Sequence, residues 1–137
     1  MNDQLGAALA AERAAIYAYG VIGVRLGATG DRAEARTAEQ THRQRRDYLV
    51  EKLPSPAANP AGYELPFPVV DRASALKLAI QVEDGVAQAW RPVLPASAGA
   101  DRTTALAALT DAAVRATRWR RLAGVTPVTI PFPGKAG

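Results

Sequence analysis

The feature that most constrains the fold is a proline-rich segment near the middle of the chain, PSPAANPAGYELPFPVV at residues 54–70. Proline lacks a backbone N–H and breaks a helix interior, so this segment cannot be helical. It also lacks the alternation of polar and apolar residues that is typical of a strand. We expect an extended, semi-rigid connection that Tyr63 and Phe67 anchor by packing onto the domain. The chain is thereby divided into two halves joined by a long crossover.

Each half contains two segments with apolar residues at the three- and four-residue spacing of an amphipathic helix. The expected helices cover residues 3–26, 32–53, 72–94 and 102–122. We expect Asp31 and Asp71 to cap the second and third helices, and Gly124 to close the fourth.

The connections between these helices are short, long and short along the chain. Short connections join antiparallel neighbours, so the pattern predicts two helical hairpins linked by one crossover, the connectivity of ferritin-like bundles. With 137 residues, the chain has the length of a single domain. We predict an all-α four-helix bundle in one domain (1–137), with the crossover at 54–70 and an extended C-terminal tail at 124–137 that Ile130 and Phe132 anchor.

Composition excludes several classes of chemistry. The chain has no cysteine, which rules out disulfides, zinc–thiolate sites and thiol nucleophiles. Any metal would need oxygen ligands and the single imidazole. The sequence has no phosphate-cradling glycine loop and no nucleophile elbow. Its N-terminus has no basic region of a secretory signal, and no apolar run approaches the ~20 residues of a membrane span, so we expect a cytoplasmic protein without a membrane partner.

The first and third helices resemble each other when shifted by 71 positions. The matching pairs include Leu5 with Leu76, Glu12 with Glu83, and Tyr19 with Trp90. The second and fourth helices match at a shift of 72, which aligns Glu39 with Asp111, Arg43 with Arg115, Arg46 with Arg118, and His42 with Val114. The chain is therefore interpreted as two related helical hairpins whose similarity breaks at the only histidine.

Acidic residues lie within the apolar stripes of these helices. Glu12 falls between Leu9 and Ile16 on the first helix, and Glu83 follows Ile80 on the third. A buried carboxylate is costly unless it meets a cation, a metal or a proton. The placement therefore predicts a polar cluster inside the bundle.

The second helix adds a possible ligand pair, because Glu39 and His42 form a Glu-x-x-His sequence and share a face with Arg46. On the fourth helix Asp111 could join the same interior, although the alanine-rich sequence does not fix which face points inward.

One glutamate from each of two helices and Glu-x-x-His from the other two is the ligand set of ferritin-like di-iron proteins. Glu12, Glu39–His42 and Glu83 resemble three of its four parts, and Asp111-Ala-Ala-Val114 departs from it because the second histidine is missing. This resemblance implies that iron or manganese would bind at Glu12, Glu39, His42 and Glu83.

The chain also resembles a family of ferritin-like domains of unknown function from high-GC Gram-positive bacteria. The stretches that carry this likeness cover nearly the whole chain; they are LAAERAAIYAYGVIG, THRQRRDYL, YELPFPVVD, LAIQVEDGVAQAWR and LTDAAVRATRWR. This likeness implies the fold and, by analogy, a homodimer, but it implies neither an activity nor a protein partner.

Three interpretations of the polar residues follow. In the one we favour, arginines have replaced the metal, so that Arg46, Asp111, Arg115 and Arg118 complete a polar core cluster in a structural or interaction domain. The second is a metal-binding redox protein. The third is a weak nucleic-acid binder, which a net charge of +4 does not demand.

Three of these residues also have simple structural alternatives. His42 can be a neutral core histidine that is hydrogen-bonded to Glu12 or Glu39. Glu39 can pair with Arg43 across one helical turn, and Asp111 can pair with Arg115 at the same spacing. These local interactions remain alternatives to membership of the ligand set or of the arginine-containing cluster.

Overall fold

In the part of the chain that the structure describes, four long helices and one short helix form the fold. The computed structural model describes residues 1–136. Its helices are α1 (Asn2–Gly23), α2 (Thr29–Lys52), α3 (Arg72–Trp90), the one-turn α4 (Val93–Ala96) and α5 (Gly99–Ala123). Residues 1–136 contain no strand, and the predicted all-α four-helix bundle is confirmed.

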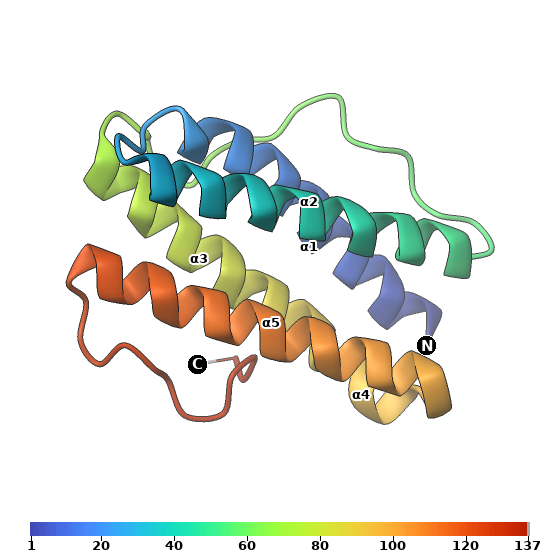
Figure 1. The fold of residues 1–137 in the computed structure, drawn as a ribbon. Coiled ribbons are helices and arrows are strands. Elements are labelled where there is room, and N and C mark those ends of the chain that lie inside the picture. Colours follow the sequence, from blue (N-terminus) through green and yellow to red (C-terminus); the bar gives the residue numbers. More distant parts are fainter. Residues whose placement is uncertain (137) are drawn as a thin grey trace.

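The four long helices are arranged as two antiparallel hairpins, α1–α2 and α3–α5 (Figure 1). The segment between α2 and α3 runs back along the length of the bundle, so these two helices point in the same direction. The closest pairings are α3 with α5, α1 with α2, and α1 with α3. The predicted connectivity is therefore confirmed.

Two of the three residues that were expected to cap or end a helix do so in the structure. Asp71 caps α3, because its side chain accepts the backbone N–H of Ser74 at 2.9 Å. Gly124 ends α5 in the left-handed conformation, with φ of 71°. The α2 helix instead begins at Thr29, so Asp31 lies in its first turn and accepts a hydrogen bond from Arg72 at 3.0 Å.

The proline-rich crossover is held by aromatic side chains. The ring of Tyr63 stacks on that of Tyr17 with centroids 5.1 Å apart. Phe67 packs against the core, and the Lys77 ammonium lies 4.6 Å from the centroid of its ring. Tyr63 and Phe67 therefore take the anchoring positions expected for them.

The C-terminal tail folds back beside α3 and α5 (Figure 1). Arg91 holds it, since its Nη1 donates to the carbonyl oxygens of Phe132 at 3.2 Å and Pro133 at 2.9 Å. The Phe132 side chain is 67% exposed, so the expectation that this ring anchors the tail is wrong. Backbone carbonyls take that role, while Ile130 is 39% exposed. Position 137 of the expected tail lies outside the described residues.

The core consists of two apolar clusters along the bundle axis. One contains Leu9, Leu49 and Trp90, and the other contains Tyr19 and Trp119. On α3, Glu83 lies between Ala79 of the second cluster and Val86 of the first. On α2, His42 lies between Ala38 and Leu49 in the same way. The predicted polar cluster therefore lies near the middle of the bundle, where the two apolar clusters meet.

Among residues 1–136, α1 is the one helix that is long and apolar enough to cross a membrane by length and composition. The expectation that no segment would reach this criterion is not met, because alanine raises the mean hydropathy of its most apolar window to 1.2. In the bundle 44% of that window is buried, and a helix in a protein core meets the same criterion.

Candidate functional site

Three polar side chains meet inside the bundle. Glu12 of α1 and Glu83 of α3 are 0% exposed, and His42 of α2 is 1% exposed. Each residue occupies a position of its helix that faces the core, so the three helices bring the side chains together without help from a loop.

The imidazole of His42 lies between the two carboxyl groups. Its Nδ1 is 3.1 and 3.0 Å from the two oxygens of Glu12, and its Nε2 is 3.1 and 2.9 Å from those of Glu83. A neutral imidazole has a single N–H, whereas the protonated ring donates from both nitrogens. The geometry therefore favours an imidazolium that bridges the two carboxylates.

The electrostatics of the site agree with this assignment. Burial alone lowers the pKa of His42, because the charged ring loses water. Hydrogen bonds to Glu12 and Glu83 outweigh the burial and raise the pKa of the imidazole to about 9. His42 is therefore a cation at neutral pH.

Aromatic donors complete the shell around the carboxyl groups. The Tyr19 hydroxyl donates to Glu83 at 2.8 Å, and Trp119 Nε1 donates to the Tyr19 oxygen at 2.9 Å. Trp90 Nε1 makes a longer contact of 3.4 Å with Glu12. Burial and the neighbouring Glu83 raise the pKa of Tyr19 well above its usual range, so this hydroxyl stays protonated.

These aromatic contacts were not predicted from the sequence, in which the same residues look like ordinary core side chains. The one available signal was the match of Tyr19 with Trp90 between the related helices. In the structure the two contacts are reciprocal, because Tyr19 of α1 donates to Glu83 of α3 and Trp90 of α3 donates to Glu12 of α1.

Arg115 supplies the second positive charge. Its side chain is 7% exposed, and its guanidinium donates to Asp111 at 2.8 and 3.1 Å and lies 3.4 Å from Glu83. Burial works against the charged form, but Glu83 and Asp111 together raise the pKa of Arg115. The two fully buried carboxylates are balanced, because one imidazolium and one guanidinium face the two glutamates, whereas the Asp111 side chain is 35% exposed at the edge of the cluster.

Three other residues expected near this cluster lie elsewhere. Glu39 is 3.8 Å from Arg43 on the outside of α2, as in the local alternative. Arg46 pairs with Asp47 at 2.8 Å. The Arg118 side chain is 62% exposed and reaches only Glu34, at 3.8 Å. Spacing along the sequence placed these residues near the inward face. In the structure the side chains of Glu39 and Arg46 are each 30% exposed, and none of the three contacts Glu12, His42 or Glu83.

The buried positions of α2 and α5 correct the alignment of the two hairpins. They coincide at a shift of 70, which matches Ala35, Ala38 and His42 with Ala105, Ala108 and Ala112. The counterpart of His42 is therefore Ala112, whereas Val114 is 46% exposed. The Ala112 side chain has no polar atom to offer the cluster, and the long Arg115 side chain reaches Glu83 from the next turn.

The donor set does not fit a metal ion. Glu12 and Glu83 contact opposite nitrogens of one ring, so no single ion can touch both carboxyl groups and the imidazole. Glu39, the fourth expected ligand, lies on the outside of α2. Within residues 1–136 no group of three or more histidine and acidic side chains is arranged to hold an ion.

The same contacts limit catalysis at the cluster. All four oxygens of Glu12 and Glu83 and both nitrogens of His42 already have partners. General acid–base chemistry needs a group within hydrogen-bond reach of a substrate atom. The arrangement can hold a proton between two carboxylates and fix the positions of three helices.

Together, the fold and this cluster define a class of protein, an all-helical bundle with a charge-balanced glutamate–histidine–arginine core. The chain belongs to the family described as "Domain of unknown function (DUF4439)", which matches residues 4–137.

A solved relative has the same architecture. It is the crystal structure of a conserved hypothetical protein, rv2844, from Mycobacterium tuberculosis, with 38% sequence identity and a TM-score of 0.80. The match covers 88% of this chain and 95% of that chain. No curated protein matches the chain.

The contacts of Tyr19 allow a direct test of the aromatic shell. We expect Tyr19→Phe to lower the free energy of unfolding by about 2–3 kcal/mol, because Glu83 loses a donor and Trp119 loses its acceptor. Urea unfolding followed by circular dichroism measures this loss. The control is Tyr17→Phe, whose ring is 41% exposed and which should change stability by no more than about 0.5 kcal/mol. Equal losses for the two variants would show that the shell contributes nothing.

Proposed function

We propose that this protein is a ferritin-like bundle whose di-metal site has degenerated, and that it serves as a structural or interaction domain without a redox metal. The observation that carries the proposal is the position of His42. Its ring bridges Glu12 and Glu83 through both nitrogens, so the imidazolium takes the place of a cation between the carboxylates.

The charges around the ring support this function. With His42 and Arg115 facing Glu12 and Glu83, the buried carboxylates are already compensated. A metal ion would add positive charge to a balanced cluster and would require His42 to lose a proton. The missing second histidine, at the Ala112 position, removes a further ligand.

The cluster favours one alignment of the helices of the bundle over others. His42 contacts both glutamates only when α1, α2 and α3 are correctly aligned along their axes, because each hydrogen bond is about 3 Å long. A buried polar group that fixes register in this way rejects slipped arrangements of the helices. The outer faces of this rigid bundle are then available for interaction.

A metal titration tests the proposal. Protein freed of metal with a chelator is incubated anaerobically with Fe²⁺, or with Mn²⁺, at pH 7.5, desalted, and analysed by elemental mass spectrometry. We expect far less than one ion per chain in the wild type. Glu83→Gln and the surface control Glu39→Ala should give the same low value, because neither residue is a ligand.

A stoichiometric ion in the wild type that is lost in Glu83→Gln would contradict the proposal, and its loss or retention in Glu39→Ala would show whether Glu39 is also a ligand. That result would establish the metal-binding alternative, with the buried glutamate as a ligand.

A further inference from the structure

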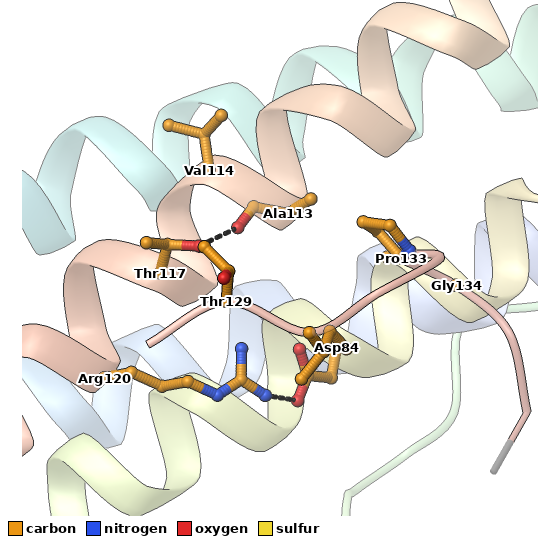
Figure 2. Close-up of a pocket in the computed structure, with 10 residues that line it drawn as sticks. Asp84, Ala113, Val114, Thr117, Arg120, Thr129, Pro133 and Gly134 are labelled. Atoms are coloured by element: carbon orange, nitrogen blue, oxygen red, sulfur yellow. Dashed lines mark hydrogen bonds and ion pairs between the residues drawn. The ribbon is translucent and has the colours of Figure 1, made fainter. Parts of the chain in front are cut away.

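A cavity of about 220 Å³ lies outside the bundle core, between α3, α5 and the C-terminal tail (Figure 2). Ala87 lines it from α3, and Ala113 and Val114 line it from α5. Ile130 and Pro133 of the tail form its other wall. None of these residues belongs to the Glu12–His42–Glu83 cluster, so the cavity is a separate feature of the molecule.

The tail that covers the cavity is fixed by specific contacts. Gly134 has φ of 81°, and a Cβ atom there would lie 2.6 Å from the carbonyl oxygen of Ala87. Only glycine allows so close an approach in this conformation. Together with the two hydrogen bonds from Arg91, this contact fixes the distance between the tail and α3. The space beneath it is therefore part of the fold.

The lining is mainly apolar but carries one ion pair. Arg120 Nη2 donates to Asp84 Oδ2, and Figure 2 shows this pair on one side of the cavity. The Arg120 residue is 8% exposed. Within residues 1–136, Asp84 Oδ1 and the remaining guanidinium N–H groups of Arg120 have no other side-chain partner. The pair thus offers one free acceptor beside free donors.

We propose that this cavity binds a small uncharged molecule that has an apolar body and one amide-like group. The amide N–H would donate to Asp84 Oδ1, and its carbonyl would accept from Arg120. A charged ligand would find no counter-ion, because Asp84 and Arg120 already neutralise each other. The apolar body would lie against Ala87, Ala113 and Val114.

The volume fits this class of ligand. An apolar cavity of about 150 Å³ is enough to hold benzene. The cavity beside the tail, at about 220 Å³, therefore has room for a single ring with an amide. The Asp84 side chain is 25% exposed, which leaves a path from solvent to the polar end.

Benzamide is the probe that tests this inference, with benzoate and toluene as matched compounds. Binding is followed by chemical-shift changes of backbone amides in the full ¹⁵N-labelled chain. We expect benzamide to bind with a dissociation constant on the order of 1 mM, shifting residues of α3, α5 and the tail. Benzoate and toluene should each bind about tenfold more weakly, because one adds an uncompensated charge and the other lacks the amide.

Two variants check the position of the site. Ala113→Leu fills the cavity and should weaken benzamide binding at least about tenfold, whereas Ala107→Leu, on the exposed face of the same helix, should bind like the wild type. Val114→Trp places a large side chain over the cavity from a position that is 46% exposed. It provides a second test if Ala113→Leu disturbs the tail.

The inference would be overturned by any of three results. The first is the absence of chemical-shift changes at about 10 mM benzamide, a concentration roughly ten times the expected dissociation constant. The second is a set of chemical-shift changes confined to other parts of the bundle. The third is benzamide binding that is unchanged in both cavity variants. Because this site shares no residue with the proposed cation-bridged core, the metal titration and the benzamide titration succeed or fail independently.

Discussion

Replacing His42 with alanine should lower the free energy of unfolding by about 3–5 kcal/mol, because two buried carboxyl groups lose the cation between them. For a domain of this size the loss corresponds to a fall in melting temperature of roughly 10 to 20 °C. Thermal and urea unfolding at pH 6.5, followed by far-UV circular dichroism, measure it. This is the largest effect that we expect from any single substitution in the chain.

Two further variants separate the charge of His42 from its volume. His42→Gln keeps two polar atoms near the glutamates but has no charge, and it should still lose about 2–4 kcal/mol. The neighbouring Arg43→Ala, on the half-exposed outside of α2, should change stability by no more than about 0.5 kcal/mol. If His42→Gln were as stable as Arg43→Ala, the imidazolium would not be what holds the glutamates together.

Stability should also depend on pH through the same residue. The pKa of His42 is raised from 6.5 to about 9 in the folded protein. A raised pKa stabilises the fold fully below the unfolded value of 6.5, and this contribution is lost as the pH rises through about 9. A shift of this size corresponds to roughly 3 kcal/mol, so the wild type should lose about that much stability between pH 6.5 and pH 9.

Urea unfolding at half-unit pH intervals measures this dependence, with His42→Gln as the reference. The variant has no group that titrates at this position, so its stability should stay nearly constant over the same range. The difference between the two curves isolates the contribution of His42. A wild-type curve parallel to that of His42→Gln, or one that rises with pH, would contradict a protonated ring in the folded state.

The fold could be predicted from the sequence because its determinants are local. Prolines in residues 54–70 exclude a helix, and the periodic apolar stripes on either side define the four long helices. Asp71 and Gly124 act as expected at helix ends. The helix start at Thr29 was missed because it has no side-chain cap, and the role of Phe132 was missed because backbone carbonyls hold the tail.

The buried members of the cluster could also be located from the sequence. Glu12 and Glu83 stand out because they interrupt apolar stripes, and His42 stands out as the only histidine, next to a glutamate at helical spacing. The structure brings these three residues together with Arg115 and Asp111. It leaves Glu39, Arg46 and Arg118 outside.

Spacing along the sequence could not show which arginine side chains point into the bundle and which point out of it. On an alanine-rich helix such as α5, several faces are equally apolar, so the inward one is decided by packing against α3. The hydrogen bonds of the aromatic side chains could not be predicted for a similar reason. A tryptophan or tyrosine in an apolar stripe fits a core position whether or not its polar atom has a hydrogen-bond partner. The cavity beside the tail depends on a close approach by Gly134, which only the folded chain reveals.

The most direct test of a cation-bridged core is the protonation state of His42 itself. Since the chain has one histidine, NMR of protein labelled with ¹³C and ¹⁵N in histidine gives its titration without assignment. We predict protons on both ring nitrogens at pH 7.5 and a midpoint near pH 9. A single ring proton at pH 7.5, with a midpoint at or below 6.5, would contradict the account.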